Sequence, residues 1–266
     1  MEIISSLEQV KKRIASLCRQ SAGTVAVDFY DETNGHGFSF AGTRAVPSAS
    51  TIKVLILAEL LRQVEQGLLS LEQRVTIRKE DYTGGDGILK ELEPGHVFTL
   101  KELATLMIIV SDNLATNRII GLVGMENVNA LGKELGLQAA RLGRRMMDSD
   151  ALARGMDNWI SAGDMGKLLR KIYEGTLVSQ RASKFMLDIL KRQQQGERLQ
   201  RYLPETVPLA HKCGDLDGVE NDGGIFLLPD HPYILVVLTS HMPDNRSGRE
   251  TIGRISRWVW ETMTGG

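Results

Sequence analysis

The chain of 266 residues is long enough to bury a sizeable core, and it fits one large domain or two interleaved lobes. Its hydrophobic content of 42% and charged content of 24% are ordinary for a globular protein. A net charge of −1 gives no electrostatic reason to expect a nucleic-acid or membrane partner, and no apolar run approaches the length of a membrane span.

The N-terminal residues and the cysteines bear on the compartment. Residues 1–17 have the periodicity of an amphipathic helix and lack the basic start, apolar middle and small-residue cleavage site of a signal peptide. We therefore expect a cytoplasmic protein, or a secreted one if the chain is a mature form. Cys18 and Cys213 are far apart in sequence, which favours two free thiols over a disulfide framework.

The remaining elements follow from hydrophobic periodicity and turn signals. Residues 24–30 and 36–41 predict two strands of a hairpin, joined by a turn that contains Asn-Gly. Helices are predicted over 50–66, 99–110, 114–122, 126–135, 163–174 and 179–193. Three further strands are predicted over 207–212, 223–228 and 233–240, before a last helix that contains Ile252, Ile255, Trp258 and Val259.

This order predicts an α+β fold. The five strands would form one antiparallel sheet, flanked by the N- and C-terminal helices on one face and by an all-helical lobe on the other side. We expect one catalytic domain over 1–266, with an α/β lobe (1–46 and 207–266) and a helical lobe (47–206). The site is expected at the lobe boundary. Two stretches without a clear period, 82–95 and 141–159, are long enough to be functional loops.

Ser50 and Lys53 stand at the start of a helical pattern, three residues apart, so their side chains are expected on one helix face and within reach of each other. A serine hydroxyl needs a group to take its proton, and a lysine can do so where a partly dry, electropositive setting lowers its pKa. Free N–H groups at the helix start favour negative charge on an attacked carbonyl oxygen. Taken alone, the pair also fits an N-cap serine and a solvated lysine.

Two more motifs carry polar side chains. Ser-Asp-Asn at 111–113 alone is typical of a connector between helices, and Lys-Cys-Gly at 212–214 alone is typical of a strand end with an exposed lysine. Combined with Ser-x-x-Lys at 50–53, in this order and spacing, they form the set found in class A β-lactamases and penicillin-binding proteins. The chain resembles the class A β-lactamase-like serine hydrolases over nearly its whole length, and that family has the two-lobed architecture expected here.

The resemblance implies a role for each motif residue. Ser50 would be the acylated nucleophile, and Lys53 would accept or relay its proton. Ser111 would pass the proton to the leaving amine, and Asn113 would hydrogen-bond the substrate's amide side chain and Lys53. Lys212 would support Ser111 and attract a substrate carboxylate.

Further substrate contacts are implied around the last motif, from Cys213, Gly214 and Asp215. The oxyanion hole would consist of the backbone N–H groups of Ser50 and Asp215, and each such donor typically contributes about 2.7–4 kcal/mol of transition-state stabilisation. No metal or cofactor is implied, and no His, Glu and Asp residues have the spacing of metal ligands.

The chain departs from the family pattern in the stretch that begins at Arg141. There the family presents a glutamate that activates water for deacylation, and this chain has Met146, whose thioether cannot act as a base. Asp148 or Asp150 is our candidate for the missing deacylation base. The alternative is that both aspartates are loop carboxylates that pair with Arg141, Arg144 or Arg145.

Two departures surround Lys212. Cys213 replaces the family's threonine or serine, which should weaken carboxylate binding modestly. A catalytic role for Cys213 is not favoured, because no histidine is placed convincingly to activate it; the side chain of His211, two residues before it, would lie on the same side of the strand. The acidic run 215–222 stands where family members often carry an arginine, and it argues against a strongly anionic substrate. Asp217 and Asp222 also fit a solvated β-turn.

These observations together predict a serine hydrolase that opens β-lactam rings through an acyl-enzyme on Ser50, with slow deacylation. Its partner would be a small-molecule acyl substrate, either a β-lactam or an ester, and neither nucleic acid nor a membrane. One alternative is an esterase or peptidase that acts on another acyl substrate. The other is a penicillin-binding or sensor-like protein that stays acylated; Met146 favours it, and the lack of a visible export or membrane segment counts against it.

Overall fold

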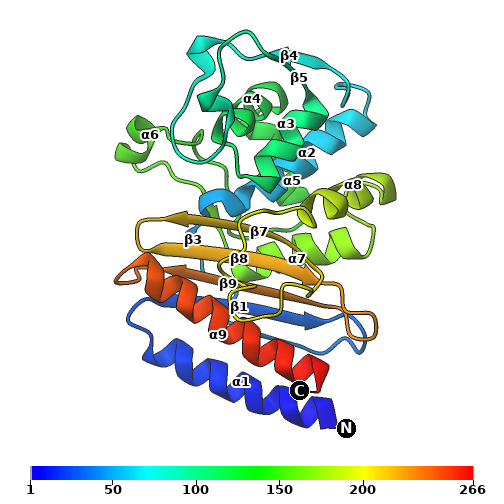
Figure 1. Ribbon diagram of the computed structural model, residues 1–266, viewed down its shortest axis with the longest axis vertical. Helices are drawn as coiled ribbons and strands as arrows, with labels where there is room; N and C mark the ends of the chain where they lie inside the picture. Colours follow the sequence, from blue (N-terminus) through cyan, green and yellow to red (C-terminus); the bar gives the residue numbers. More distant parts are fainter. Residues whose placement is uncertain (1, 266) are drawn as a thin grey trace.

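A five-stranded antiparallel sheet forms the middle layer of the computed structural model, which describes residues 2–265 (Figure 1). The strand order is β2-β1-β9-β8-β7. The strands are β1 (Thr24–Asp31), β2 (Gly37–Phe40), β7 (Leu209–Leu216), β8 (Val219–Phe226) and β9 (Tyr233–Ser240). Because β9 pairs with both β1 and β8, it joins the two ends of the chain in one sheet, as predicted.

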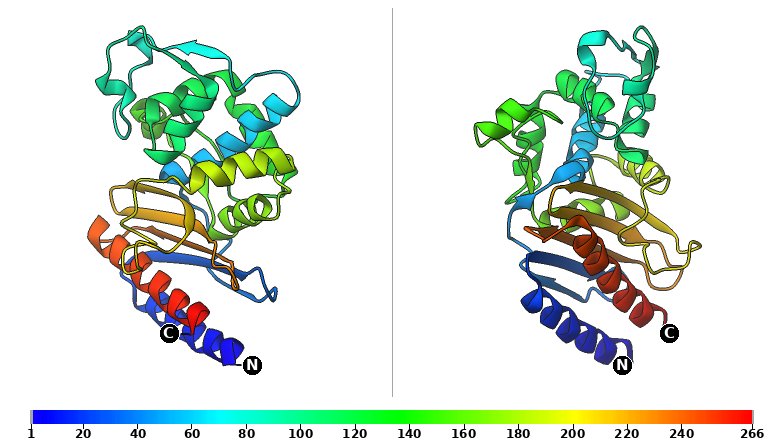
Figure 2. Two further views of the ribbon diagram at one scale, coloured as in Figure 1. Left: turned by 45° about the vertical axis from the view of Figure 1, so that its right-hand side comes forward. Right: turned by 60° about the vertical axis from the view of Figure 1, so that its left-hand side comes forward.

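The N- and C-terminal helices cover one face of this sheet. α1 (Glu2–Gln20) and α9 (Asn245–Thr264) lie side by side there, as all views show (Figures 1 and 2). Their apolar faces pack on alternate residues of β1, such as Val25 and Val27, in one buried cluster. The opposite face of the sheet, which includes Ala26, belongs to a second cluster with the helices of the middle of the chain. Since β9 is covered on both faces, all its residues are buried, and residues 233–238 form a continuous apolar run.

The middle of the chain is helical. Its helices are α2 (Lys53–Glu65), α3 (Leu100–Ile109), α4 (Asn113–Val123), α5 (Met125–Glu134), α6 (Ser149–Ala153), α7 (Ala162–Tyr173) and α8 (Gln180–Leu190). Three 3₁₀ turns span Ala49–Ile52, Lys79–Asp81 and Leu89–Glu91, and two small antiparallel ribbons pair β3 (Val46–Pro47) with β6 (Trp159–Ile160) and β4 (Arg74–Thr76) with β5 (Val97–Thr99). α2 contacts α3, α4, α5 and α8, so it is apolar nearly all round.

We propose that the described residues form one catalytic domain of two lobes, with the boundaries expected from the sequence. α7 packs against β1, β8 and β9, so it is the layer through which the helical part meets the sheet (Figure 1). Residues 1 and 266 of the predicted domain lie outside the described residues. Within residues 2–265, no helix combines the length and the apolar character that a bilayer crossing requires.

The structure corrects the prediction for the acidic run. β8 begins at Val219 rather than at 223, because the turn falls at Asp217 and Gly218, where Gly218 has a φ of 65°. Two carboxylates of this strand are paired. Glu220 forms an ion pair with Arg198, and the buried Asp222 has its Oδ1 2.9 Å from Nδ1 of His211. The solvated reading is therefore wrong for Asp222, whereas Asp217 is exposed in the turn.

Candidate active site

The segment that carries Ser50 is held by residues distant in sequence. Ser50 is half-buried in the 3₁₀ turn directly before α2, so the α-helix begins at Lys53 and not at the serine itself. The amide of Asn221, on β8, donates to the carbonyl oxygens of Pro47 and Ser48 at 2.9 and 3.2 Å. Ser48 N donates to the Asn158 carbonyl at 2.8 Å. Two separate parts of the chain thus fix the backbone at Ser50.

Gly214 lets β7 approach the nucleophile. A Cβ at this position would lie 2.4 Å from Ser50 N and 3.1 Å from Ala49 Cβ, closer than side chains tolerate. Only glycine fits there without moving one of the two segments. The close approach places β7 alongside the Ser50 backbone amide, as an oxyanion hole built from Ser50 and Asp215 requires.

Lys53 is fully buried, and its environment is polar. Its Nζ donates to Ser111 O at 2.7 Å, Ser111 Oγ at 3.1 Å and Asn113 Oδ1 at 2.8 Å. Ser111 adopts a φ of 54°, a left-handed conformation that is costly for a residue with a side chain. The reading of Lys53 as a solvated lysine is therefore wrong. Within residues 2–265 no hydrogen bond joins Lys53 Nζ to Ser50 Oγ.

Lys212 approaches the same hydroxyl group. Its Nζ donates to Ser111 Oγ at 3.2 Å and to the Cys213 carbonyl at 2.7 Å. Burial lowers the pKa of Lys53 well below its ordinary value, and the charge of Lys212 lowers it further. Burial also lowers the pKa of Lys212. Both effects shift Lys53 toward the neutral amine, which is the form that can accept a proton.

A cleft of 160 Å³ adjoins this cluster, and both irregular stretches noted in the sequence contribute to its walls. Its lining includes Ser50, Asp86, Asn113, Met146, Asp157 and Asp215. The structure thus brings the three sequence motifs together around one cleft. It also adds Asp86 and Asp157, which no motif had singled out.

Met146 forms part of the cleft wall with a nearly buried side chain. The Asn117 side chain fixes its backbone on both sides, accepting from Met146 N at 2.8 Å and donating to Met146 O at 3.1 Å. An apolar residue therefore stands in the wall of the cavity that Ser50 also lines. Its correspondence to the family glutamate stays a prediction.

The two candidate bases lie elsewhere. Asp148 accepts a hydrogen bond from Ala151 N at 2.8 Å and caps α6, while Asp150 is exposed on that helix. Neither lines the cleft, so the geometry gives no support to either as the deacylation base. The loop arginine Arg144 pairs instead with Asp157, at 2.8 Å.

Cys213 is not among the residues that line the cleft. Its thiol is buried and lies 3.5 Å from both the carbonyl and the side-chain oxygen of Gln195. Burial raises the pKa of the Cys213 thiol, which keeps it protonated and unreactive. The next residue but one, Asp215, pairs with Arg198 at 2.5 Å, so part of the negative charge expected here is neutralised.

Asp112, the middle residue of the Ser-Asp-Asn motif, fastens a loop to the site. Its buried carboxylate accepts from Ile88 N and Leu89 N at 2.7 and 2.9 Å and caps α4 by accepting from Ala115 N at 2.8 Å. The stretch 82–95 is thereby held against the cleft. The sequence had indicated the capping role only.

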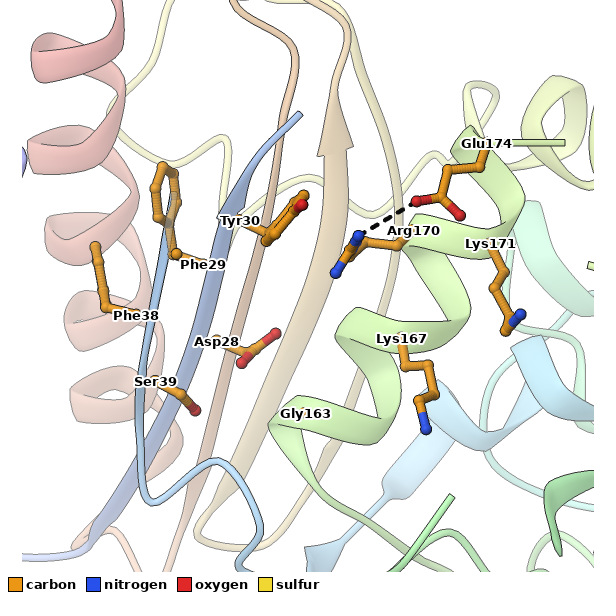
Figure 3. A pocket seen from close by; sticks show the side chains of 11 residues that line it. Asp28, Phe29, Tyr30, Phe38, Ser39, Gly163, Lys167, Arg170, Lys171 and Glu174 are labelled. Carbon is orange, nitrogen blue, oxygen red and sulfur yellow. Dashed lines mark hydrogen bonds and ion pairs between the residues drawn. The ribbon is translucent and has the colours of Figure 1, made fainter. Parts of the chain in front are cut away.

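A larger pocket of 640 Å³ lies elsewhere, between β1, β2 and α7 (Figure 3). There the Arg170 guanidinium stacks on the Tyr30 ring at 3.5 Å and pairs with Glu174 at 3.3 Å. Figure 3 shows Lys167 extending away from Asp28, and its Nζ donates to two backbone carbonyls of the α5–α6 connection. Because this pocket contains none of the motif residues, the cleft at Ser50 is the better candidate. Among residues 2–265, no group of His, Cys, Asp and Glu has the arrangement of a metal site.

Comparison with known proteins agrees with this geometry. The model of the beta-lactamase enzyme family matches residues 9–263. A beta-lactamase of Citrobacter koseri is 26% identical over 249 residues, covering 92% of this chain and 84% of that protein. The crystal structure of a beta-lactamase from Sphaerobacter thermophilus has a TM-score of 0.89 at 32% identity, covering 97% of each chain.

A second structural relative is PBP-A. A substituted form of it, solved as an acyl-enzyme complex with penicillin G, has a TM-score of 0.89 at 29% identity and covers 98% of each chain. The family matches span nearly the whole sequence, and they confirm the resemblance drawn from the three motifs. The chain belongs to the beta-lactamase enzyme family and is a serine hydrolase of the class A beta-lactamase type.

Proposed function

We propose that this serine hydrolase opens β-lactam rings through a covalent acyl-enzyme on Ser50. The observation that carries the proposal is the Ser111 hydroxyl, which lies between the amines of Lys53 and Lys212 beside the cleft that Ser50 lines. Such an arrangement supplies a nucleophile, a base of lowered pKa and a proton route to a leaving group.

Acylation begins when Lys53, as a neutral amine, takes the proton of the Ser50 hydroxyl, directly or through a relay. A hydrogen bond between these side chains then has to form with substrate bound, which is common for catalytic contacts that are long in the free enzyme. Ser50 Oγ attacks the lactam carbonyl carbon. The backbone N–H groups of Ser50 and Asp215 stabilise the oxyanion, beside the close approach that Gly214 permits.

Collapse of this intermediate breaks the bond between the carbonyl carbon and the ring nitrogen. The nitrogen takes a proton from Ser111 Oγ, and the adjacent lysines replace it through the hydrogen bonds of 3.1 and 3.2 Å. Asn113 binds the amide side chain of the substrate, and Lys212 attracts its carboxylate. The product of this half-reaction is an ester of Ser50.

Deacylation is the slow step in this proposal. Water must attack the ester, and the residue of the cleft wall that we align with the family's glutamate is Met146, whose thioether cannot act as a base. The Asp157 carboxylate also lines the cleft, but it is already engaged in an ion pair with Arg144 at 2.8 Å. Met146 in the cleft wall also favours a second candidate function, that of a penicillin-binding protein that is acylated without turnover.

A time course with a chromogenic cephalosporin, followed by intact mass spectrometry, tests the proposal. We expect slow steady turnover and a transient adduct, both lost in Ser50→Ala. Ser149→Ala, at an exposed serine of α6, serves as the matched control. A burst of one equivalent with the ligand mass retained would identify an acyl trap.

Absence of both adduct and turnover would contradict the β-lactam reading. Activity on a panel of esters in the same experiment would then support the esterase or peptidase alternative, because an alkoxide is easier to expel than an amide nitrogen. The expected compartment, cytoplasmic or secreted as a mature form, is a separate prediction that cell fractionation tests.

A further inference from the structure

We propose that Asp86 makes the cleft selective for β-lactams whose acyl side chain carries a protonated amine next to an apolar ring. The inference rests on the proposed function and names the substrate class of the same site. Its basis is the position of Asp86, the pairing of the other acids in the cleft and the apolar side chains around it.

Two glycines place Asp86 against the Ser-Asp-Asn motif. A Cβ on Gly85 would lie 2.4 Å from Asn113 Nδ2, and a Cβ on Gly87 would lie 2.3 Å from Asp112 Oδ2. Both glycines have positive φ values, 76° and 111°, so residues with side chains would also be strained there. Between them, the Asp86 carbonyl accepts a hydrogen bond from Asn113 N at 3.0 Å. The backbone of Asp86 is thereby fixed at the cleft.

The charge of Asp86 is free to act on a ligand. The two other acids lining the cleft have arginine partners, Arg144 for Asp157 and Arg198 for Asp215. In the described part of the chain, neither an ion pair nor a hydrogen bond engages the carboxylate of Asp86, which is exposed.

Three neighbouring lysines do not form an ion pair with the Asp86 carboxylate. Lys90 donates to the Gly85 carbonyl and lies 3.8 Å from Glu91. Lys53 and Lys212 have their nitrogens bonded to Ser111; burial lowers the pKa of both, and the charge of Asp86 opposes this lowering only at longer range. The cleft therefore has one lining carboxylate, that of Asp86, that is available to attract an amine of the ligand.

The neighbouring side chains indicate the rest of the ligand. Asn113 is the expected partner of the substrate's side-chain amide, so an amine on the carbon next to that amide would lie on the Asp86 side. Met147 and Leu216 also line the cleft and are 54% and 36% exposed, which gives an apolar ring a surface to contact. Ampicillin has this combination, and benzylpenicillin is its counterpart without the amine.

The test compares second-order acylation rate constants of the intact protein for ampicillin and benzylpenicillin, measured by mass spectrometry near pH 6.5, about one unit below an ordinary α-amino pKa. In Asp86→Asn we expect the ampicillin-to-benzylpenicillin ratio to fall about three- to tenfold, between the effect of an exposed ion pair and that of a charged hydrogen bond. The ratio is the right readout, because any change in Lys53 or Lys212 affects both substrates and cancels. At about 1 M salt, where the Debye length is about 3 Å, the preference of the wild type should shrink.

Asp86→Glu keeps the charge and should restore part of the ratio. Asp217→Asn removes an equally exposed charge from the β7–β8 turn outside the cleft and should leave the ratio unchanged. An unaltered ratio in Asp86→Asn, with both penicillins still acylating Ser50, would overturn this inference alone. An equal fall in Asp217→Asn would show a general charge effect and would also overturn it. If a folded wild type accepts neither penicillin, the proposed function fails and this inference fails with it.

Discussion

Lys53 and Lys212 donate hydrogen bonds to one hydroxyl oxygen, that of Ser111, at 3.1 and 3.2 Å. Two buried amines around one oxygen disfavour double protonation, since each charge would be poorly hydrated and would repel the other. The arrangement therefore disfavours two charged lysines, and a lysine left neutral can accept a proton. That property suits a reaction in which a proton must leave the nucleophile and reach a leaving nitrogen.

The lowered pKa of Lys53 predicts a pH dependence of stability. Its folded-state pKa lies well below the ordinary 10.5, so between these values the unfolded chain binds more protons than the folded one. The free energy of unfolding should therefore rise with pH across this window, as the cost of burying the charge is lost.

The variant Lys53→Met should flatten this rise with pH and reduce acylation about 10²- to 10⁴-fold. Urea unfolding at several pH values measures it, with exposed Lys133→Met as control; parallel slopes for Lys53→Met and wild type would contradict the prediction.

The contact between Gly214 and Ser50 predicts a selective loss of activity. In Gly214→Ala the new Cβ would lie 2.4 Å from Ser50 N, so β7 or the nucleophile turn must move. Displaced oxyanion donors should cost about 10²- to 10³-fold in acylation. The matched control is Gly121→Ala in α4, where the nearest atom would be 3.7 Å away and helix propensity should add about 0.5–1 kcal/mol of stability. Burst kinetics and thermal unfolding provide the readouts, and full activity in Gly214→Ala would refute the oxyanion-hole geometry.

Met146→Glu should speed deacylation. A carboxylate at this wall of the cleft would face the ester of Ser50 and supply the general base, an effect typically worth about 10²- to 10⁴-fold. Met147→Glu places the same charge one residue on, at a side chain that is 54% exposed, and should not produce the gain. Loss of the acyl mass over time measures the rate. Equal rates in the two variants would mean that position 146 does not face the acyl group.

The pair Arg144 and Asp157 should matter for stability. Arg144 is 8% exposed, so Asp157→Ala would leave a nearly buried guanidinium unpaired and should cost about 3–5 kcal/mol. Glu174→Ala removes one of the two carboxylate partners of the partly exposed Arg170, the other being Glu32, and should cost about 0–1 kcal/mol. Chemical denaturation of both variants tests this contrast. Similar costs would show that the pair contributes no more than a surface ion pair.

The sequence alone was sufficient where the signal is local. The period-two and apolar runs predicted the five strands, and capping and periodicity predicted most helices, because one strand or helix turn determines these patterns. The three motifs also gave the candidate site residues Ser50, Lys53, Ser111, Asn113 and Lys212, since each motif is three or four residues long. The acidic run was wrongly predicted to be solvated at Asp222, because the partners of its carboxylates lie outside the run. Glu220 and Asp222 are strand residues, and they pair with Arg198 and His211.

The supporting contacts were decided only by the tertiary structure. Asn221 reaches Pro47 across 174 residues, and Arg144 selects Asp157 rather than Asp148 or Asp150, which are nearer in sequence. No local pattern encodes such choices, because they depend on which loops the packed sheet and helices bring together. Sequence proximity placed the candidate bases beside Met146, whereas the capping of α6 by Asp148 turned that segment away from the cleft. The spacing of residues within each motif was enough to suggest its chemistry. Which other charged residues line the cleft depends on packing between segments that are distant in sequence.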